Sequence, residues 1–371
     1  MIRIILLSCI LILGINKVYS QIHVEWDEKS ILKINETGQY PRLMVLQDGF
    51  YICVYEDNKG NCCLNKYNKD WKLQKKDIIF TTKKVVNGDL VGVTRPANPE
   101  LLQLRSGRVI YVCNYRSWID GLSPYSIVIK YSDDNCNTWS DINYVYRADD
   151  KLKNGCWEPK MIELPTGEIQ LYFSDENQYR NSNEQEIVLM SSFDKGVNWS
   201  RPRQVCYSVG KRDGMAVPII VGSNILMAIE DNTFGKHQPS ILTSSIKNNW
   251  RKPIMADSKQ RYFVGKDMFD GTVYGGAPYI AASENGDIFL SFQTTYNRNS
   301  DLKYASMGLA IKPRKSSKYY FDSFPFLLDE KQSGLWGSLY IIDSDHLVAL
   351  SSITKEGVQA PYLIIGRIIK Y

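Results

Sequence analysis

Residues 158–174, EPKMIELPTGEIQLYFS, contain two apolar runs separated by a Thr-Gly turn. This pattern is typical of a β-hairpin, because the turn glycine adopts a positive φ without steric cost. Proline in the second place removes no interior ladder bond when it stands at the start of a strand. The stretch therefore predicts a hairpin whose first strand begins at Glu158 and whose second strand ends at Ser174.

The same pattern recurs along the chain at a spacing of about 60 residues, which is typical of a repeat protein. The predicted hairpins start at Tyr40, Asn98, Glu158, Gly214, Ala277 and Trp336. They end at Glu56, Asn114, Ser174, Glu230, Gln293 and Ser352. More strand-like sequence follows each hairpin, and helical patterns are rare. Radial repetition of four-stranded sheets forms a β-propeller, so we predict an all-β fold of six four-stranded antiparallel blades.

The sixth repeat and its tail, PYLIIGRIIKY, are one strand short of a complete blade. Residues 22–34, IHVEWDEKSILKI, also have the pattern of a strand. We expect this N-terminal strand to complete the sixth blade and to close the ring.

Residues 1–20 have the features of a cleavable signal peptide: a positive Arg3, an apolar stretch and small residues before Gln21. We therefore expect a secreted or periplasmic protein in which residues 21–371 form a single propeller domain. Residues 6–9 resemble a lipoprotein box, but they stand too early in the apolar stretch to indicate a lipid anchor. No later apolar run is long enough to span a membrane.

Charge and cysteine content exclude several classes of protein. The net charge is +5, with acids and bases interspersed, which does not suggest a nucleic-acid partner. The cysteines that follow Cys9 match no zinc pattern. We expect mostly buried free thiols, with Cys53 and Cys113 in strands. The three histidines are scattered, so we predict no metal site and no cofactor, and we expect a monomer.

Two further segments share the pattern S-x-D-x-(G)-x-x-W, which is that of the Asp-box in sialidase-like propellers. They are residues 132–139 and 192–199, and residues 245–250 resemble a decayed third copy. The aspartate can accept hydrogen bonds from turn amides while the tryptophan packs between outer strands. We predict structural turns away from the axis, although Cys136 replaces the usual glycine in the first copy.

Strand geometry predicts where the chemistry lies. The start and the end of an antiparallel hairpin lie together, so the polar residues at these positions should ring one face of the propeller. Two of them, Glu158 and Glu230, belong to adjacent repeats. Trp157 and Pro159 should desolvate Glu158 and raise its pKa, as a general acid requires, while Glu230 has polar neighbours and suits a charged role. Two such carboxyl groups are what glycoside hydrolysis needs.

The other side chains expected around this pocket are aromatic rings that stack on sugars and polar groups that bind hydroxyls. They are Tyr40, Arg42, Asn98, Arg116, Trp157, Asp175, Tyr274, Gln293 and Trp336. The expected partner is an oligosaccharide or polysaccharide. The alternative interpretation is a solvated rim of ordinary loop-end polar residues.

Four segments together resemble glycoside hydrolase family 93, the exo-acting arabinanases of the sialidase superfamily. They are residues 97–116, 157–176, 212–231 and 275–294, and the resemblance extends over nearly the whole mature chain. It implies a six-bladed propeller that removes arabinobiose from the non-reducing ends of α-1,5-linked arabinan with retention of configuration. By position, Glu158 resembles the acid/base of that family and Glu230 its nucleophile.

Two other functions stay open. A true sialidase requires three arginines around a carboxylate and a tyrosine nucleophile backed by a glutamate. Arg42 resembles the first such arginine and Arg116 would serve as another, but neither a third arginine nor a Tyr–Glu pair can be matched. The chain would also fit a non-catalytic glycan-binding propeller, although binding alone does not require two well-placed glutamates.

Overall fold

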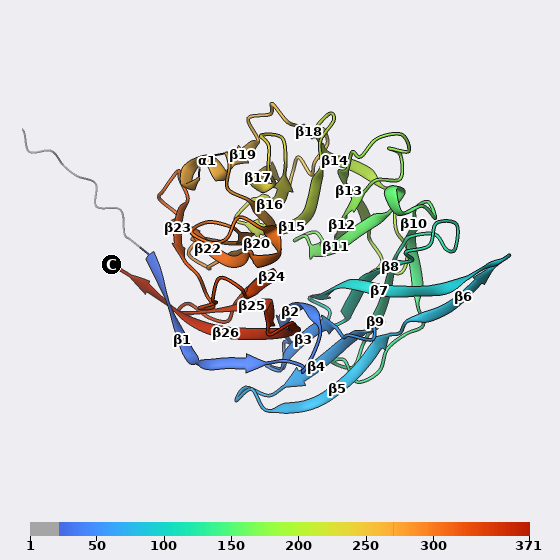
Figure 1. The fold of residues 1–371 in the computed structure, drawn as a ribbon, viewed down its shortest axis with the longest axis horizontal. Coiled ribbons are helices and arrows are strands. Elements are labelled where there is room, and N and C mark those ends of the chain that lie inside the picture. The colour runs from blue at the N-terminus through green and yellow to red at the C-terminus, as the bar shows by residue number, and fades with distance from the viewer. Residues whose placement is uncertain (1–21, 270) are drawn as a thin grey trace, which may run out of the picture.

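The computed structural model describes residues 22–269 and 271–371, whose regular structure is almost entirely β-strand. Six sheets surround a central axis as the blades of a propeller (Figure 1). The predicted signal peptide lies outside the described residues. Among the described helices, none is long and apolar enough to cross a membrane.

The strands of each blade are given from the channel outwards. Blade 1 consists of β2 (Gln39–Val45), β3 (Tyr51–Glu56), β4 (Cys62–Tyr67) and β5 (Leu73–Phe80). Blade 2 consists of β7 (Leu90–Gln103), β8 (Val109–Arg116), β9 (Ser126–Ser132) and β10 (Asn143–Arg147). Blade 3 consists of β11 (Cys156–Glu163), β12 (Ile169–Asp175), β13 (Glu186–Ser192) and β14 (Arg203–Tyr207).

Blade 4 consists of β15 (Asp213–Val221), β16 (Asn224–Asp231), β17 (Gln238–Ser245) and β19 (Arg261–Phe263). Blade 5 consists of β20 (Gly275–Ala282), β21 (Ile288–Thr294), β22 (Ser306–Lys312) and β23 (Tyr320–Ser323). Blade 6 consists of β24 (Ser333–Ile341), β25 (His346–Lys355), β26 (Val358–Lys370) and β1 (Ile22–Lys33). The described helical turns are α1 (Gly265–Met268) and two 3₁₀ turns, Leu152–Asn154 and Leu302–Tyr304.

The predicted six-bladed propeller is therefore confirmed, with two additions to the four-stranded pattern. Strand β6 (Lys83–Asn87) pairs with the first part of the long β7, and this hairpin projects beyond the ring (Figure 1). Strand β18 (Ile254–Met255) pairs in parallel with the outer edge of blade 3. Both additions attach to strands that the hairpin pattern already accounts for, so the ring itself is unchanged.

The N-terminal strand closes the ring as predicted. Strand β1 pairs antiparallel with β26, with Ile22 opposite Lys370 and Lys33 opposite Tyr362. The first and last strands of the described chain therefore share one sheet. Strand β26 is thereby covered, and β1 forms the outer edge of blade 6.

The hydrophobic core lies mainly between neighbouring blades. Between blades 6 and 1, for example, Val348 and Leu350 pack in one cluster with Cys53 and Tyr55, all fully buried. Similar clusters fill the other junctions. Burial of this apolar surface holds the blades to one another, as expected for a repeat fold.

Every innermost strand begins with a bulge. Near its start, one non-glycine residue has a positive φ between 45° and 58° and the pairing register shifts. These residues are Tyr40, Asn98, Glu158, Met215, Ala277 and Trp336. Five are the predicted hairpin starts. In blade 4 the bulged residue is Met215 instead of Gly214, because the sequence there has no proline to mark the position.

The bulged residues also join the blades. The backbone N–H of five of them donates to a side-chain oxygen at the end of the second strand of the preceding blade. The acceptors are Glu56, Ser174, Glu230, Gln293 and Ser352, at distances from 2.7 to 3.1 Å. The hairpin ends and starts therefore meet on one face, as the sequence predicts. At the sixth junction, Asn114 instead donates to the carbonyl of Cys156 at 3.2 Å.

The two predicted Asp-box segments form matching turns on the opposite face, between the third and fourth strands of blades 2 and 3. Asp134 accepts from the N–H of Thr138 at 2.8 Å, and Asp194 accepts from the N–H of Asn198 at 2.9 Å. Cys136 keeps the left-handed conformation of the glycine it replaces, with φ of 68°. The cysteines of the described chain are buried free thiols, as expected.

The junction hydrogen bonds generate a prediction about stability. Ser352→Ala removes the acceptor of the buried Tyr40 N–H, so the free energy of unfolding should fall by about 1–3 kcal/mol. Urea unfolding followed by tryptophan fluorescence measures the change. Ser351→Ala is the control, since its hydroxyl only donates to the Leu335 carbonyl at 3.3 Å and its loss should cost less. Equal effects of the two substitutions would contradict a specific role for the junction bond.

Candidate active site

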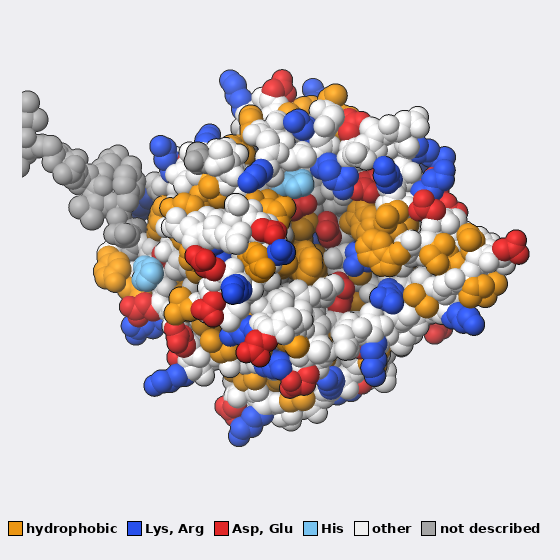
Figure 2. Space-filling view, viewed as in Figure 1, with side chains coloured by type: hydrophobic (Ala, Val, Ile, Leu, Met, Phe, Trp, Pro, Cys, Tyr) orange, Lys and Arg blue, Asp and Glu red, His pale blue; other side chains and the backbone are white. Residues whose placement is uncertain are grey.

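Glu158 and Glu230 lie in one cavity of about 300 Å³ on the face where the hairpins end. Glu158 comes from the bulge that opens β11, and Glu230 is the residue before the last of β16 in the next blade. The remaining lining residues are Leu152, Lys153, Trp157, Glu176, Asn183, Gln185 and Arg212. Figure 2 shows a hollow at the centre of one face of the propeller, with acidic side chains inside it. The predicted pairing of the two glutamates is thus present in the structure.

The surroundings of Glu158 favour its neutral form. Burial and the negative charge of Glu230 raise the pKa of Glu158 to about 8, and the charge of Glu176 adds to the rise. Arg116 and the N–H of Met215 act in the opposite direction. Since the ordinary pKa of a glutamate is about 4.3, Glu158 holds its proton at neutral pH, as a general acid must.

Glu230 is held by the backbone of the following blade. Its Oε2 accepts from the N–H of Ala277 at 3.0 Å, a contact that stabilises a carboxylate. Gly214 makes room beside it, because a Cβ at that position would stand 3.1 Å from Glu230 Oε1 and 2.7 Å from Gln185 Oε1. Glu230 is therefore fixed in position while its second oxygen lines the cavity.

A third carboxylate belongs to the site, and we did not predict it. Glu176 is buried and forms an ion pair with Arg212, and it accepts from Gln185 Nε2 at 3.0 Å. Arg212 also donates to the Asn183 carbonyl at 2.8 Å. Glu176 directly follows the predicted strand, which is a usable signal. Arg212 and Gln185 come from connections between strands, where no pattern identifies them.

The channel beneath the cavity is closed by a cluster of charged side chains. Arg42, Glu100, Lys160 and Tyr279 each stand two residues after a bulged position. Glu100 accepts from Lys160 at 2.6 Å and from Tyr279 at 3.4 Å, and lies 3.5 Å from Arg42. Arg42 is only 3% exposed and also donates to the Trp336 carbonyl at 2.9 Å. Its guanidinium is thus engaged inside the channel. Arg42 and Glu158 line a small space there, but Arg42 does not line the larger cavity that holds both glutamates.

Other predicted site residues are distributed around the same end of the channel. Tyr40 is buried, with the Arg42 guanidinium 3.7 Å from its ring centre. Asp175 is buried in its blade and accepts from the Tyr146 hydroxyl at 2.9 Å. Asn98 is likewise buried. None of these three lines the cavity of the two glutamates.

The remaining predictions fall on blades 5 and 6 and near Trp157. Tyr274 accepts from Gln293 Nε2 at 2.5 Å, and Gln293 accepts from the Trp336 N–H at 3.0 Å. Negative charge on Glu230 and Glu158 contributes to the raised pKa of Tyr274, which places its phenol near both carboxyl groups. Trp157 lines the cavity itself.

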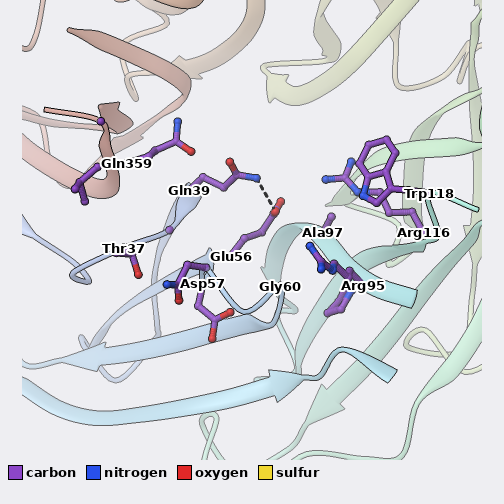
Figure 3. A pocket seen from close by; sticks show the side chains of 15 residues that line it. Thr37, Gln39, Glu56, Asp57, Gly60, Arg95, Ala97, Arg116, Trp118 and Gln359 are labelled. Atoms are coloured by element: carbon purple, nitrogen blue, oxygen red, sulfur yellow. Dashed lines mark hydrogen bonds between the residues drawn. The ribbon is translucent and has the colours of Figure 1, made fainter. Parts of the chain in front are cut away.

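A second cavity of about 500 Å³ opens on the same face, between blades 6, 1 and 2. Arg95, Arg116 and Trp118 line one side of it, and Gln39 and Glu56 the other (Figure 3). Arg116 connects the two cavities, because its guanidinium lies 5.8 Å from the ring centre of Trp157.

Comparison with solved structures identifies the arrangement of the blades. The Penicillium chrysogenum α-L-arabinanase complexed with arabinobiose superposes with a TM-score of 0.63 at 17% identity, over 95% of this chain and 98% of the other. The family 93 α-L-arabinofuranosidase of Fusarium graminearum with arabinobiose gives a TM-score of 0.61 at 18% identity, over 95% and 98%. The Trypanosoma rangeli sialidase in complex with the inhibitor DANA gives 0.61 at 9% identity, over 90% of this chain and 55% of the other.

These likenesses show that the chain has the six-bladed propeller fold of family 93 arabinanases and sialidases. No protein-family model and no curated protein matches the sequence. The likeness in structure therefore extends well beyond any detectable likeness in sequence.

The protonated state of Glu158 can be tested without a substrate. Below pH 4.5 the carboxyl is neutral in both folded and unfolded chains, and between pH 4.5 and about 8 only the unfolded chain loses its proton. The wild-type protein should therefore lose stability over this range, whereas Glu158→Gln should not. We expect the melting temperature of the variant to match wild type at pH 4 and to exceed it by several degrees at pH 9. Glu284→Gln, at an exposed position, is the control and should show no such divergence.

Proposed function

We propose that this protein is a glycoside hydrolase in which Glu158 is the acid/base and Glu230 the nucleophile. The observation that supports this most strongly is the pair itself. Two carboxyl groups from adjacent blades share one cavity, and the surroundings of Glu158 raise its pKa so that it keeps its proton at neutral pH. A rim of solvated polar residues would not raise the pKa of one glutamate to about 8.

The proposed reaction takes two steps. Glu230 attacks the anomeric carbon while the proton of Glu158 passes to the glycosidic oxygen, so the leaving sugar departs as an alcohol. Glu158, now a carboxylate, takes a proton from water, and the oxygen of that water attacks the anomeric carbon and releases Glu230. Displacement twice at the same carbon retains the configuration.

We propose linear α-1,5-arabinan as the substrate, with release of arabinobiose from the non-reducing end. The resemblance of residues 157–176 and 212–231 to family 93 supports this choice. Two structures that share the fold were solved with arabinobiose. A sialidase is less well supported, because Arg42, which resembles the first arginine of that site, is buried and engaged by Glu100.

The first activity prediction separates the roles of the glutamates. On linear arabinan, Glu230→Gln and Glu158→Gln should each lower kcat by about a thousandfold or more, because each removes a group that acts on the reacting atoms. On an aryl glycoside with a good leaving group, Glu158→Gln should keep much more of its first-step rate, since little protonation is needed. Product analysis by anion-exchange chromatography measures both.

The same assay decides between the alternative functions. Release of free sialic acid from sialyllactose, with no sugar released from arabinan, would show that the protein is a sialidase and not an arabinanase. No product from either substrate, with binding of the glycan retained, would indicate a glycan-binding propeller. Near-normal activity of both variants would overturn the assignment of the two glutamates.

The second prediction concerns pH. Because Glu158 must be protonated to act as the acid, kcat/KM should fall as the pH rises through about 8. Glu176→Gln removes a negative charge that raises the pKa of Glu158 and should move this limb to lower pH. Arg116→Met removes a positive charge that lowers it and should move the limb to higher pH. Shifts in the same direction would contradict the electrostatic account.

A further inference from the structure

Two arginines stand side by side in the second cavity, and neither forms an ion pair within the described chain. Arg95 of β7 and Arg116 of β8 are directly opposite each other in the register, so their side chains share one face of blade 2. Like charges in this position repel and destabilise a sheet unless something neutralises them. In the described chain, neither guanidinium has a hydrogen bond or an ion pair, and Figure 3 shows both pointing into the cavity.

The carboxylates that line the same cavity are already occupied. Glu56 accepts from the Asn98 N–H at 2.7 Å and from Gln39 Nε2 at 2.9 Å. Asp57 accepts from the backbone N–H of Lys59 at 2.9 Å and of Asn61 at 2.8 Å. Both acids keep their charge, but these contacts hold them in turns and junctions, and neither forms an ion pair with Arg95 or Arg116 in the described chain. The two guanidinium groups therefore remain available to a ligand.

An aromatic ring stands beside the arginines. The Trp118 side chain is 59% exposed, and its ring centre lies 5.3 Å from the Arg116 guanidinium. A large aromatic surface left open to water next to cationic donors is suited to the face of a sugar ring with an anionic substituent. Arginine binds a carboxylate through two parallel hydrogen bonds, which gives it more specificity than a lysine would have.

The cavity lies on the side from which the leaving sugar departs. Glu158 delivers the proton to the leaving oxygen, and Arg116 is the cation whose charge acts on Glu158. Glu230 belongs to blade 4, across the axis from the blades that form this cavity. A chain whose scissile bond lies between the two glutamates would therefore continue past Arg116 towards Arg95 and Trp118.

We propose that this cavity is the leaving-group subsite and that it binds a sugar carrying a carboxylate, a uronic acid. Its place on the substrate path depends on the proposed function, whereas binding of the acidic sugar does not. The hydrolysed chain would then be attached to, or interspersed with, uronic acid residues.

Binding of two matched disaccharides tests the proposal. Digalacturonic acid carries the carboxylates, and α-1,4-galactobiose is its uncharged counterpart. We expect the wild-type protein to bind the acidic disaccharide about tenfold more tightly or better, with affinity that falls as salt rises, by isothermal titration calorimetry. Arg95→Met and Arg116→Met should each remove most of this preference. Trp118→Ala should weaken both ligands alike, and Arg108→Met, on the opposite face in an ion pair with Asp133, should change nothing.

The outcomes are separable from those for the glutamates. Equal affinity for the two disaccharides, or an unchanged preference in both arginine variants, would overturn the acidic subsite while leaving the glycosidase intact. In the active protein, digalacturonic acid should inhibit arabinan hydrolysis and galactobiose at the same concentration should not. Binding without inhibition would place the site off the substrate path and would also overturn the proposal.

Discussion

The site depends on a feature that all six blades share: each innermost strand contains a left-handed residue, and at five of the six junctions the N–H of that residue has an acceptor in the described chain. A non-glycine residue with positive φ is strained and persists only where its surroundings hold it. Here the acceptor comes from the end of the second strand in the preceding blade. The same bond therefore fixes the bulge, joins the blades and sets the distance between neighbouring side chains on the active face.

This constraint gives Glu230 two tasks. One carboxylate oxygen of Glu230 accepts the junction hydrogen bond from the next blade, as the side chains of Ser174, Gln293 and Ser352 do at other junctions. Glu230 also lines the cavity. A carboxylate held by the backbone cannot turn away from the cavity, so under the proposed mechanism the structural bond also orients the nucleophile. Glu158 occupies the one junction without this bond among the described residues, since Asn114 there contacts the Cys156 carbonyl instead. The Glu158 carboxyl is nevertheless held on the cavity side, because it accepts from Ser174 Oγ at 3.4 Å and from the N–H of Met215.

Hairpin spacing was enough to predict the fold, the closing strand and the shared cavity of the two glutamates, because turns and apolar runs are local features of the sequence. The bulges are not local, since they depend on an acceptor from another blade. For this reason the predicted start of the blade 4 hairpin, Gly214, lies one residue before the observed bulge at Met215. The bulge also explains why Arg42, a predicted substrate-binding residue, lies deeper in the channel, where it contacts Glu100. Arg212 and Gln185 act through Glu176 from loops that carry no periodic signal.

Some charged side chains around the active face form ion pairs within the protein and others do not. The unpaired ones indicate which charges are available to a ligand. The Glu176–Arg212 pair is neutralised internally, and in the Arg42–Glu100–Lys160 cluster both cations contact the same carboxylate. These side chains therefore shape the floor or wall of the site through ion pairs within the protein. Arg95 and Arg116, by contrast, stand opposite each other in the strand register, and neither forms an ion pair in the described chain. Repulsion between neighbouring like charges costs stability, and an anionic group of a ligand placed between the two guanidinium groups would relieve it. The same reasoning places the neutral sugar between Glu158 and Glu230, where Lys153 is the one cation among the described lining residues without an ion pair. The acidic sugar is then placed beyond Arg116.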